Sequence, residues 1–308
     1  METRISSLIS SLSFDISYLP WLIKLGRTYY PEDNPALSEH FLKWLYIDNN
    51  EGPATLIVAE EDDLWIGMMV LIPVTLERKG ELQKACFAVN LLAHPEHRTK
   101  NLFVKIIKCT REHLSSQNIW LLAHSNANSA PGWKRQKMMF RDPLHLHLAK
   151  FKLPFSGKQV RRINTLADLK ALPEDFWHKL SKNPDVHLKY TPEFIAWRFL
   201  DVPYKNYVIS AVESGNELLG LRVTRHFKWS VDLMVDFIAP NAHLCAVLAS
   251  VYKPTLLIHS GLGGVANQIN AGAWKLPYKR VFPFFITTWE PQMGDDDMNG
   301  ITLGASDF

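Results

Sequence analysis

The sequence predicts an α/β protein of two tandem domains, each with a mixed central β-sheet flanked by helices. Three observations lead to this fold class. First, apolar and β-branched runs of strand length precede and follow an amphipathic helix, which is typical of strands joined by a helical crossover. Second, polar stretches that contain glycine separate neighbouring strands, as in hairpins. Third, segments of the chain recur in the same order further along it, which indicates an internal duplication.

The recurring segments are short but keep their order. The pairs are residues 41–67 with 194–220, 89–95 with 235–240, and 121–125 with 256–260. One apolar match of this kind arises by chance in any strand-rich chain, whereas three pairs in the same order favour duplication. We therefore expect an N-terminal domain over residues 1–153 and a C-terminal domain over residues 154–308.

The first copy begins with a helix that ends near Trp44, and three strands follow it. The runs 55-TLIVAEE-61 and 66-IGMMVLIPVTL-76 are rich in β-branched and apolar residues, as strands are. The polar 77-ERKGEL-82 after them carries a glycine that suits a hairpin turn. Residues 85–93 then form the third strand.

A helix over residues 102–114 and a fourth strand over residues 119–125 complete the first copy. Leu102, Phe103, Ile106, Ile107 and Leu114 lie on one helical face, and Lys105, Lys108 and Arg111 lie off it, as a period of 3.6 residues requires. The fourth strand can run parallel to the third because a helical crossover separates them. The result is a mixed sheet.

The bulk composition is that of a globular protein. The chain has 308 residues, of which 47% are hydrophobic and 21% charged, with a formal net charge of +3. This mild positive charge suits an anionic small molecule and falls short of a nucleic-acid-binding surface. No apolar run reaches membrane-spanning length. We therefore expect no nucleic-acid partner and no membrane span.

The stretch 91-LLAHPEHRTKNLF-103 joins the apolar third strand to the helix through a basic turn. A helix N-terminus presents unpaired backbone N–H groups and the positive end of the helix dipole, so a turn leading into a helix favours a bound diphosphate. Arg98 and Lys100 add positive charge there. The strand, the turn and the parallel strand beyond the helix resemble the acyl-CoA-binding core of the GNAT superfamily of acyltransferases. Residues 125–140 resemble the segment that leads into the closing helix of that core.

The whole chain is similar to bacterial tandem GNAT proteins, many of which are associated with surface-polysaccharide or amino-sugar biosynthesis. The resemblance implies that the N-terminal copy binds acetyl-CoA or another acyl-CoA as co-substrate. It places the pantetheine arm on the backbone of the third strand and the diphosphate at the turn. The cofactor-binding residues that it implies are Leu91, Leu92, Ala93, Arg98, Thr99, Lys100, Asn101, Leu102, Phe103 and Asn126.

The turn departs from the family pattern at two positions. Asn101 stands where glycine is usual, and asparagine tolerates a left-handed backbone but carries a side chain. Phe103 stands where a small residue is usual, and it would lie near the cofactor unless the helix turns it inward. The alternative interpretation is an ordinary crossover whose Arg98 faces solvent. The second copy's turn, residues 239–250, has no Arg, Lys or Gly, so we expect a structural role there and one wall of the acceptor cleft.

Candidate catalytic residues are few. N-acyl transfer needs a neutral amine, a stabiliser for the oxyanion and a proton donor for the departing thiolate. The resemblance implies a carboxylate base on the third strand, but the residue there is Asn90, which cannot accept a proton. The candidates are therefore His94, His124 and Asp236, the last aligning with Asn90 in the second copy. Each could equally be a hydrogen-bonded structural residue. Residues 131–140 contain no tyrosine to protonate the thiolate.

No metal site is expected from the sequence. His145 and His147 alternate on a strand-like run but have no evident third ligand, and the other histidines show no tight ligand spacing. Cys86, Cys109 and Cys245 are widely spaced in apolar surroundings, which is typical of buried thiols in a cytoplasmic protein.

The sequence and the resemblance together predict an acyl-CoA-dependent N-acyltransferase, and we expect it to be an N-acetyltransferase. Its partner is a small-molecule amine acceptor, which the resemblance suggests to be an amino sugar or a related metabolite. Two alternatives stay open: a non-catalytic binding or scaffold protein on a tandem GNAT frame, and an aminoacyl-tRNA-dependent transferase. The oligomeric state is left open as well.

Overall fold

The chain forms two compact units, which are called unit 1 and unit 2 below. Unit 1 consists of Met1–Val74, Lys84–Phe140 and Phe285–Trp289, and unit 2 of Thr75–Gln83, Arg141–Phe284 and Glu290–Phe308. Each unit combines non-contiguous parts of the chain, whereas the sequence predicts a single division at residue 153. The computed structural model describes residues 8–125, 129–136, 138, 144–149, 158–204, 206–228, 231–241, 244, 255–260, 273–275 and 284–287.

Unit 1 is built on a mixed β-sheet in the strand order β1-β2-β3-β4-β5-β14. β1 pairs antiparallel with β2 and β2 antiparallel with β3, whereas β4 and β5 are parallel. The parallel pair is the one that the sequence predicts on either side of the crossover helix. The strands are β1 (Leu8–Ser13), β2 (Thr55–Glu61), β3 (Leu64–Arg78), β4 (Glu81–Ala93), β5 (Trp120–His124) and β14 (Phe284–Thr287).

Left-handed residues close the two hairpins of this sheet. Asp62 and Asp63, with φ of 52° and 58°, connect β2 to β3. Lys79 and Gly80, with φ of 52° and 83°, connect β3 to β4. Two successive residues with positive φ give the turn the twist of the flanking strands, and Asp and Gly are among the residues that tolerate this backbone best. The predicted hairpin at Gly80 is confirmed.

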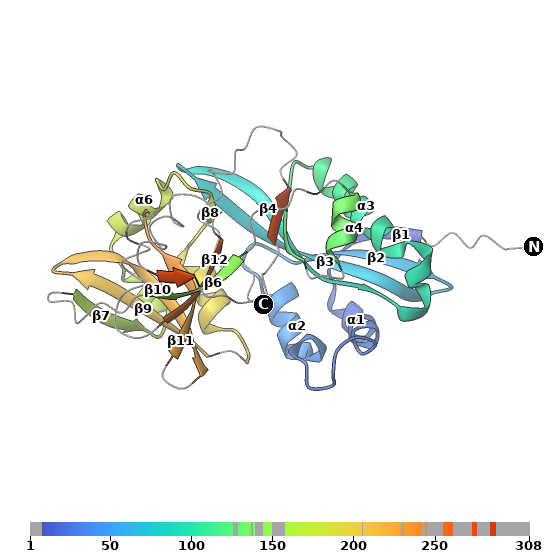
Figure 1. Ribbon diagram of the computed structural model, residues 1–308, viewed down its shortest axis with the longest axis horizontal. Coiled ribbons are helices and arrows are strands. Elements are labelled where there is room, and N and C mark those ends of the chain that lie inside the picture. Colours follow the sequence, from blue (N-terminus) through green and yellow to red (C-terminus); the bar gives the residue numbers. More distant parts are fainter. Residues whose placement is uncertain are drawn as a thin grey trace, which may run out of the picture. The chain divides into compact units, whose positions relative to one another are not determined.

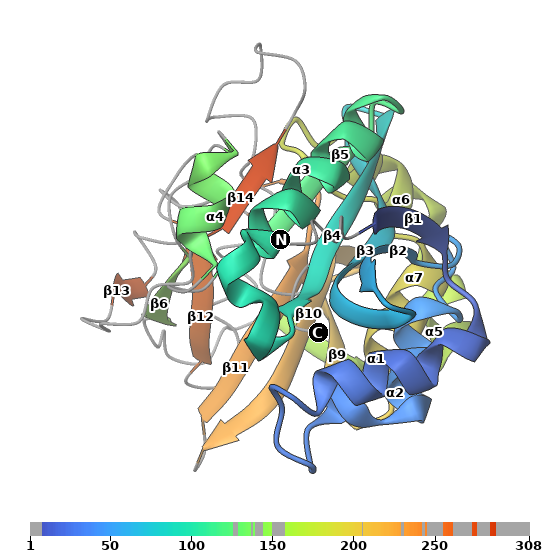
Figure 2. The same cartoon turned by 90° about the vertical axis from the view of Figure 1, so that its right-hand side faces the viewer.

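Helices cover both faces of the sheet in unit 1. Figure 1 shows α3 and α4 together on one face and α1 and α2 on the other, and in Figure 2 α3 lies across the sheet. The predicted apolar face of α3 is buried except at Phe103, while Lys105, Lys108 and Arg111 are exposed. The helices are α1 (Leu19–Gly26), α2 (Glu39–Tyr46), α3 (Leu102–Ser115) and α4 (Ala130–Arg135).

Gly67 on β3 allows α3 to pack closely on the sheet. A Cβ atom at this position would lie 2.9 Å from Cδ1 of Ile106 and 3.0 Å from Cδ2 of Leu102. Both side chains are 1% exposed or less. The absence of a side chain at Gly67 therefore sets how near the start of α3 lies to the strands.

Unit 2 is built on a sheet in the strand order β13-β6-β12-β11-β10-β9-β7. Its helices are α5 (Leu166–Lys170), α6 (Glu174–Ser181) and α7 (Pro192–Ile195), and α7 continues as a π-helical turn over Ala196–Leu200. The short β8 (His187–Leu188) pairs with Leu76 and Glu77, which lie in the part of β3 that belongs to unit 2. The strands of the sheet are β6 (Leu144–Ala149), β7 (Lys158–Ile163), β9 (Tyr207–Ser214), β10 (Glu217–Lys228), β11 (Val231–Ile238), β12 (Thr255–Ser260) and β13 (Ala273–Lys275).

The two sheets share one order of pairing. In each, an edge strand pairs with a hairpin, the hairpin leads to a third strand, and the third strand runs parallel to a fourth, β5 in unit 1 and β12 in unit 2. Beyond the parallel pair, the sheet of unit 1 continues with β14 and that of unit 2 with β6. A duplication would account for this similarity, and it stays a prediction. Among the described residues, no helix is both long and apolar enough to span a membrane.

Candidate active site

The strand β4 extends past the last of its residues that pair with β5, and a cavity lies beside this extension. The pairing of the two strands runs from Ala85 opposite Trp120 to Ala88 opposite Ala123 and ends there. The cavity beyond this point, called the strand cavity below, has a volume of about 670 Å³. It is lined by Tyr29, Tyr30, Ala88, Val89, Asn90, Leu91, Leu92, Ala93, Phe103, Ala123, His124, Ser129 and Trp133.

The unpaired end of β4 supplies much of this lining, and it includes the predicted residues Leu91, Leu92 and Ala93. Backbone N–H and C=O groups need hydrogen-bond partners when they are buried. A strand without a neighbour on one side offers such groups to an extended ligand, but both backbone groups of Ala93 are already in contact with the hydroxyl of Tyr29. This arrangement suits a linear arm that carries amides, such as pantetheine.

Asn90 anchors two tyrosines at the strand cavity. Its backbone is left-handed, with φ of 48°, which asparagine tolerates better than most residues. The hydroxyl of Tyr30 donates to Oδ1 of Asn90 at 3.1 Å, and Nδ2 of Asn90 donates to the hydroxyl of Tyr46. The residue at the position where the family resemblance implies a base thus orients neighbouring hydroxyl groups instead.

Two neighbouring tyrosines from the loop after α1 reach β4. The hydroxyl of Tyr29 donates to the carbonyl oxygen of Ala93 and accepts from the amide of Ala93, the second contact at 3.3 Å. Burial, followed by the proximity of Tyr29, raises the pKa of Tyr30 above its ordinary value of 10.0. Tyr30 therefore keeps its proton at neutral pH and can donate it within the strand cavity.

His124 lies at the end of β5 and lines the strand cavity, and its catalytic role stays a prediction. Burial lowers its pKa from 6.5 to about 4. The imidazole is consequently neutral at physiological pH. A neutral imidazole can accept a proton from an attacking amine, although its low pKa makes it a weak base.

The predicted diphosphate turn forms a 3-10 helix over Pro95–Lys100 that leads directly into α3. Asn101 between them is left-handed, with φ of 55°, so it adopts the backbone for which the family uses glycine. The first amides of α3 have no partner within the helix. The structure describes the backbone but not the side chains of Arg98, Thr99 and Lys100, and Asn126 lies outside the described residues.

Leu102 and Phe103 have different surroundings at the start of α3. The side chain of Leu102 is buried in the core of unit 1 and is 1% exposed. Leu102 can therefore offer a cofactor only its backbone amide. The ring of Phe103, by contrast, is half-buried and forms part of the wall of the strand cavity.

Gly132 on α4 makes room for the ring of Phe103. A Cβ atom at Gly132 would lie 2.3 Å from Cε1 and 2.5 Å from Cδ1 of Phe103. We expect Gly132→Ala to push the ring into the strand cavity and to lower the free energy of unfolding by about 1–3 kcal/mol. Urea denaturation measures this loss. Because Phe103→Leu removes the clash, the double variant should recover most of the stability, and equal losses in the single and double variants would contradict this contact.

His94 and Asp236 do not line the strand cavity. His94 follows β4, and its side chain lines a separate cavity, described below, with Glu96 and His97. Asp236 is on β11 of unit 2 and is fully buried. Its carboxylate accepts hydrogen bonds from the hydroxyl of Tyr190 at 2.9 Å and from the amide of Phe237 at 2.8 Å. These hydrogen bonds stabilise the buried carboxylate of Asp236. The catalytic roles of His94 and Asp236 stay predictions.

The sequence does not predict Tyr29, Tyr30 or Trp133 as site residues. The two tyrosines contact β4 residues that lie 60 and 64 positions further along the chain, so no local pattern joins them. Trp133 is 2% exposed and lines the strand cavity from α4. The only local signal is that Trp133 belongs to the segment that resembles the lead into the family's closing helix.

Neither a protein-family model nor a curated protein matches the amino-acid sequence. Solved structures, however, resemble the fold. A conserved protein of unknown function from Enterococcus faecalis, described as a probable N-acyltransferase, has a TM-score of 0.64 at 12% identity, over 91% of this chain and 73% of that one. A GCN5-related N-acetyltransferase from Anabaena variabilis has a TM-score of 0.64 at 10% identity, with the same shares covered. Another, from Kribbella flavida, has a TM-score of 0.66 at 9% identity, over 93% of this chain and 72% of that one.

These similarities extend over most of the chain, and at such low identity they concern the fold. The predicted fold class, an α/β protein with a mixed sheet flanked by helices, is confirmed. The particular fold is that of the GCN5-related N-acetyltransferases, the superfamily to which the sequence shows a resemblance.

Proposed function

We propose that the protein is an acyl-CoA-dependent N-acyltransferase. The observation that carries the proposal is the cavity beside the part of β4 that extends past its pairing with β5, close to the start of α3. The open edge of β4 suits the pantetheine arm, and the helix start suits the diphosphate. The fold of the similar structures is consistent with this use. The donor is acetyl-CoA or another acyl-CoA, and the acceptor is a small-molecule amine.

The chemistry follows from the groups that line the strand cavity. The amine nitrogen attacks the thioester carbonyl, forming the C–N bond, and the C–S bond then breaks. His124 is neutral and accepts the proton that the amine loses. Tyr30 is protonated and donates to the departing thiolate, and His124 returns its proton to Tyr30 through solvent. The products are an amide and free CoA.

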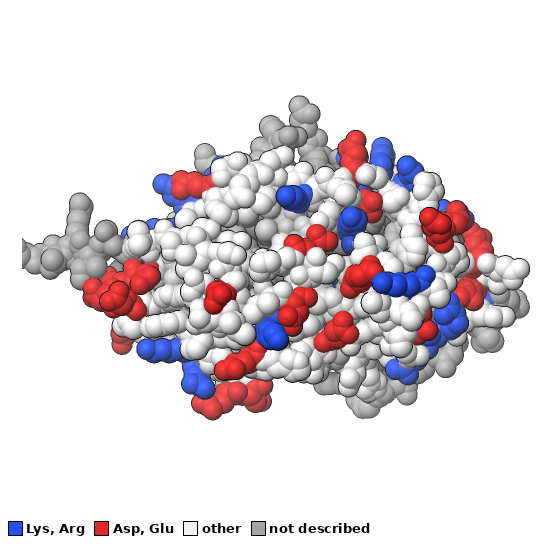
Figure 3. All heavy atoms as spheres, turned by 180° about the vertical axis from the view of Figure 1, so that it is seen from behind, with Lys and Arg blue, Asp and Glu red and all other residues white. Residues whose placement is uncertain are grey.

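The surface charge of the protein suits a small amine acceptor better than a tRNA substrate. A tRNA substrate needs an extended basic surface. Among the described residues on the face in Figure 3, acidic side chains are interspersed with basic ones. The formal net charge of the chain is only +3. We therefore assign the acceptor to the class of small amines.

The experiment is a calorimetric titration of acetyl-CoA into the wild type and Arg98→Ala. We expect micromolar binding by the wild type and an affinity lower by roughly tenfold or more in the variant, because a charged contact to phosphate is lost. Arg161→Ala is the control, since Arg161 is a half-exposed arginine of unit 2 that pairs with Glu213. Absence of binding by the wild type would refute the proposal and favour the scaffold or the aminoacyl-tRNA alternative.

A further inference from the structure

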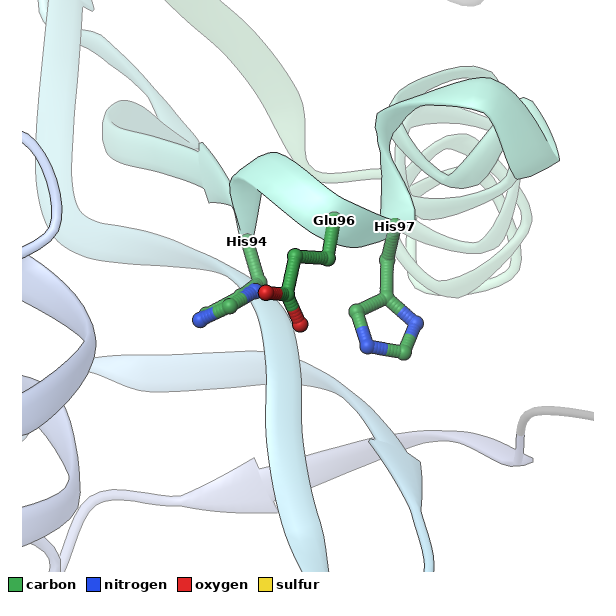
Figure 4. Close-up of side chains that lie close together, drawn as sticks. All are labelled: His94, Glu96 and His97. Atoms are coloured by element: carbon green, nitrogen blue, oxygen red, sulfur yellow. The ribbon is translucent and has the colours of Figure 1, made fainter.

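A cluster of possible metal ligands lies on the turn between β4 and α3, outside the strand cavity. His94, Glu96 and His97 each offer one ligand atom, and these atoms all lie within 4.8 Å of one another. Figure 4 shows the carboxylate of Glu96 between the two imidazoles. The sequence predicts no metal site, so this cluster is not expected from it.

The backbone of the turn brings His94 and His97 close together. His94 caps the 3-10 helix with a non-helical backbone, with φ of -47° and ψ of 134°, and Pro95 begins the helix. The ring centroids of His94 and His97 lie 5.7 Å apart. The fixed φ of proline favours such a helix start. The two imidazoles are therefore held on the same side of the turn before any ion binds.

The Nδ1 atom of His94 is buried without a hydrogen-bond partner among the described residues. The backbone amide of His94 is satisfied, since it donates to the carbonyl oxygen of Ile66 at 2.7 Å. A buried polar atom without a partner is rare in native proteins, and a bound ion or water commonly accounts for it. A metal ion on Nδ1 would satisfy this atom.

Glu61 orients His97 for metal binding. Oε2 of Glu61 lies 2.9 Å from Nδ1 of His97, at ion-pair distance but without hydrogen-bond alignment, and the carboxylate side chain is only 7% exposed. The negative charge favours a proton on Nδ1, which leaves a lone pair on Nε2. In Figure 4, one ring nitrogen of His97 points toward Glu96 and the other points away. A carboxylate behind a ligating histidine is a common arrangement in metal sites.

The three ligands face a cavity that leaves room for another ligand. This cavity, called the turn cavity, has a volume of about 280 Å³. Its other walls include Trp21 and Trp65, whose rings are stacked with their centroids 6.2 Å apart. Two histidines, one glutamate and an open position form a set that suits Zn²⁺, whose ligands lie at about 2.0–2.2 Å. The side chains would have to approach one another by about an ångström to reach this geometry.

We propose that His94, Glu96 and His97 bind one Zn²⁺ ion, with Glu61 positioning His97 and the fourth coordination position open to the turn cavity. The site requires no acyl-CoA, so the proposal does not depend on the proposed function. The ion would fix the turn that leads into α3.

The test is a calorimetric titration of Zn²⁺ into chelator-treated protein without a histidine tag. We expect one site per chain with a micromolar or lower Kd. Glu96→Gln and His97→Ala should each weaken binding by at least about tenfold, and Glu61→Gln by about 10–100-fold. His40→Ala is the matched control, because His40 is an exposed histidine on α2, and it should leave the affinity unchanged.

A second measurement separates this site from surface histidines. Co²⁺ in place of Zn²⁺ should give visible absorption bands typical of a tetrahedral site, and these should disappear in His97→Ala. Thermal unfolding of each variant without metal establishes that it is folded. The proposal is overturned if no binding with one ion per chain occurs, or if folded Glu96→Gln and His97→Ala bind Zn²⁺ as the wild type does. Acetyl-CoA titrations on the same samples report separately on the strand cavity.

Discussion

Replacing Tyr30 by phenylalanine is expected to lower the rate constant of acyl transfer by about 10²-fold or more. The ring that lines the strand cavity is retained, but the hydroxyl group that donates to Asn90 is lost. Burial raises the pKa of this phenol, so it carries a proton at neutral pH that it can donate to the thiolate within the cavity. Steady-state release of CoA measures kcat, with the amine that gives the highest rate in an acceptor screen.

The affinity for acetyl-CoA should change little in Tyr30→Phe, since the hydroxyl acts on the leaving group. A fall in kcat without a matching rise in Kd distinguishes proton donation from a loss of binding. Tyr18→Phe serves as control, because the ring of Tyr18 packs on Phe14 and Trp65 outside the strand cavity. A kcat within about threefold of the wild type in Tyr30→Phe would exclude Tyr30 as the proton donor.

Acid should destabilise the wild type through His124. The pKa of this residue is about 4 in the folded protein, because of burial, and its ordinary value is 6.5. Between these two pH values the unfolded chain binds a proton that the folded chain does not, so the free energy of unfolding falls as the pH decreases. The full loss is about 3 kcal/mol by pH 4, and the contribution is constant above pH 6.5.

The measurement is urea denaturation at pH values from 4 to 7 for the wild type and His124→Gln. Other groups titrate in this range, so the informative quantity is the difference between the two proteins. The stability of His124→Gln should fall less steeply below pH 6.5, because glutamine does not titrate. His40→Gln, at an exposed position, should retain the wild-type slope. Parallel curves for the wild type and His124→Gln would show that His124 is not buried as a neutral group.

Local sequence patterns predict much of unit 1. The strands, the hairpin at Gly80 and the apolar face of α3 depend on side-chain periodicity and turn chemistry, which are properties of neighbouring residues. The left-handed backbone of Asn101 follows from the same kind of reasoning. In unit 2 the second copy's turn lies largely outside the described residues, so its expected structural role stays a prediction.

The site could be predicted only in part, because it depends on contacts between distant segments. His124 and the end of β4 were accessible to prediction, since they lie where strands end beside the helix. Tyr29 and Tyr30 come from another part of the chain. The separation of His94 from the strand cavity depends on the backbone of β4, because a left-handed residue such as Asn90 interrupts the regular alternation of side chains along a strand.

The most direct test of the acyl-CoA site is whether the free edge of β4 contacts acetyl-CoA. Protein labelled with ¹⁵N-leucine reports on the amides of Leu91 and Leu92, and Leu91→Met and Leu92→Met assign their signals in NMR spectra. We predict that both signals shift saturably as acetyl-CoA is added, at concentrations that match the calorimetric Kd. Unchanged Leu91 and Leu92 signals at concentrations that saturate binding would contradict a pantetheine site between β4 and β5.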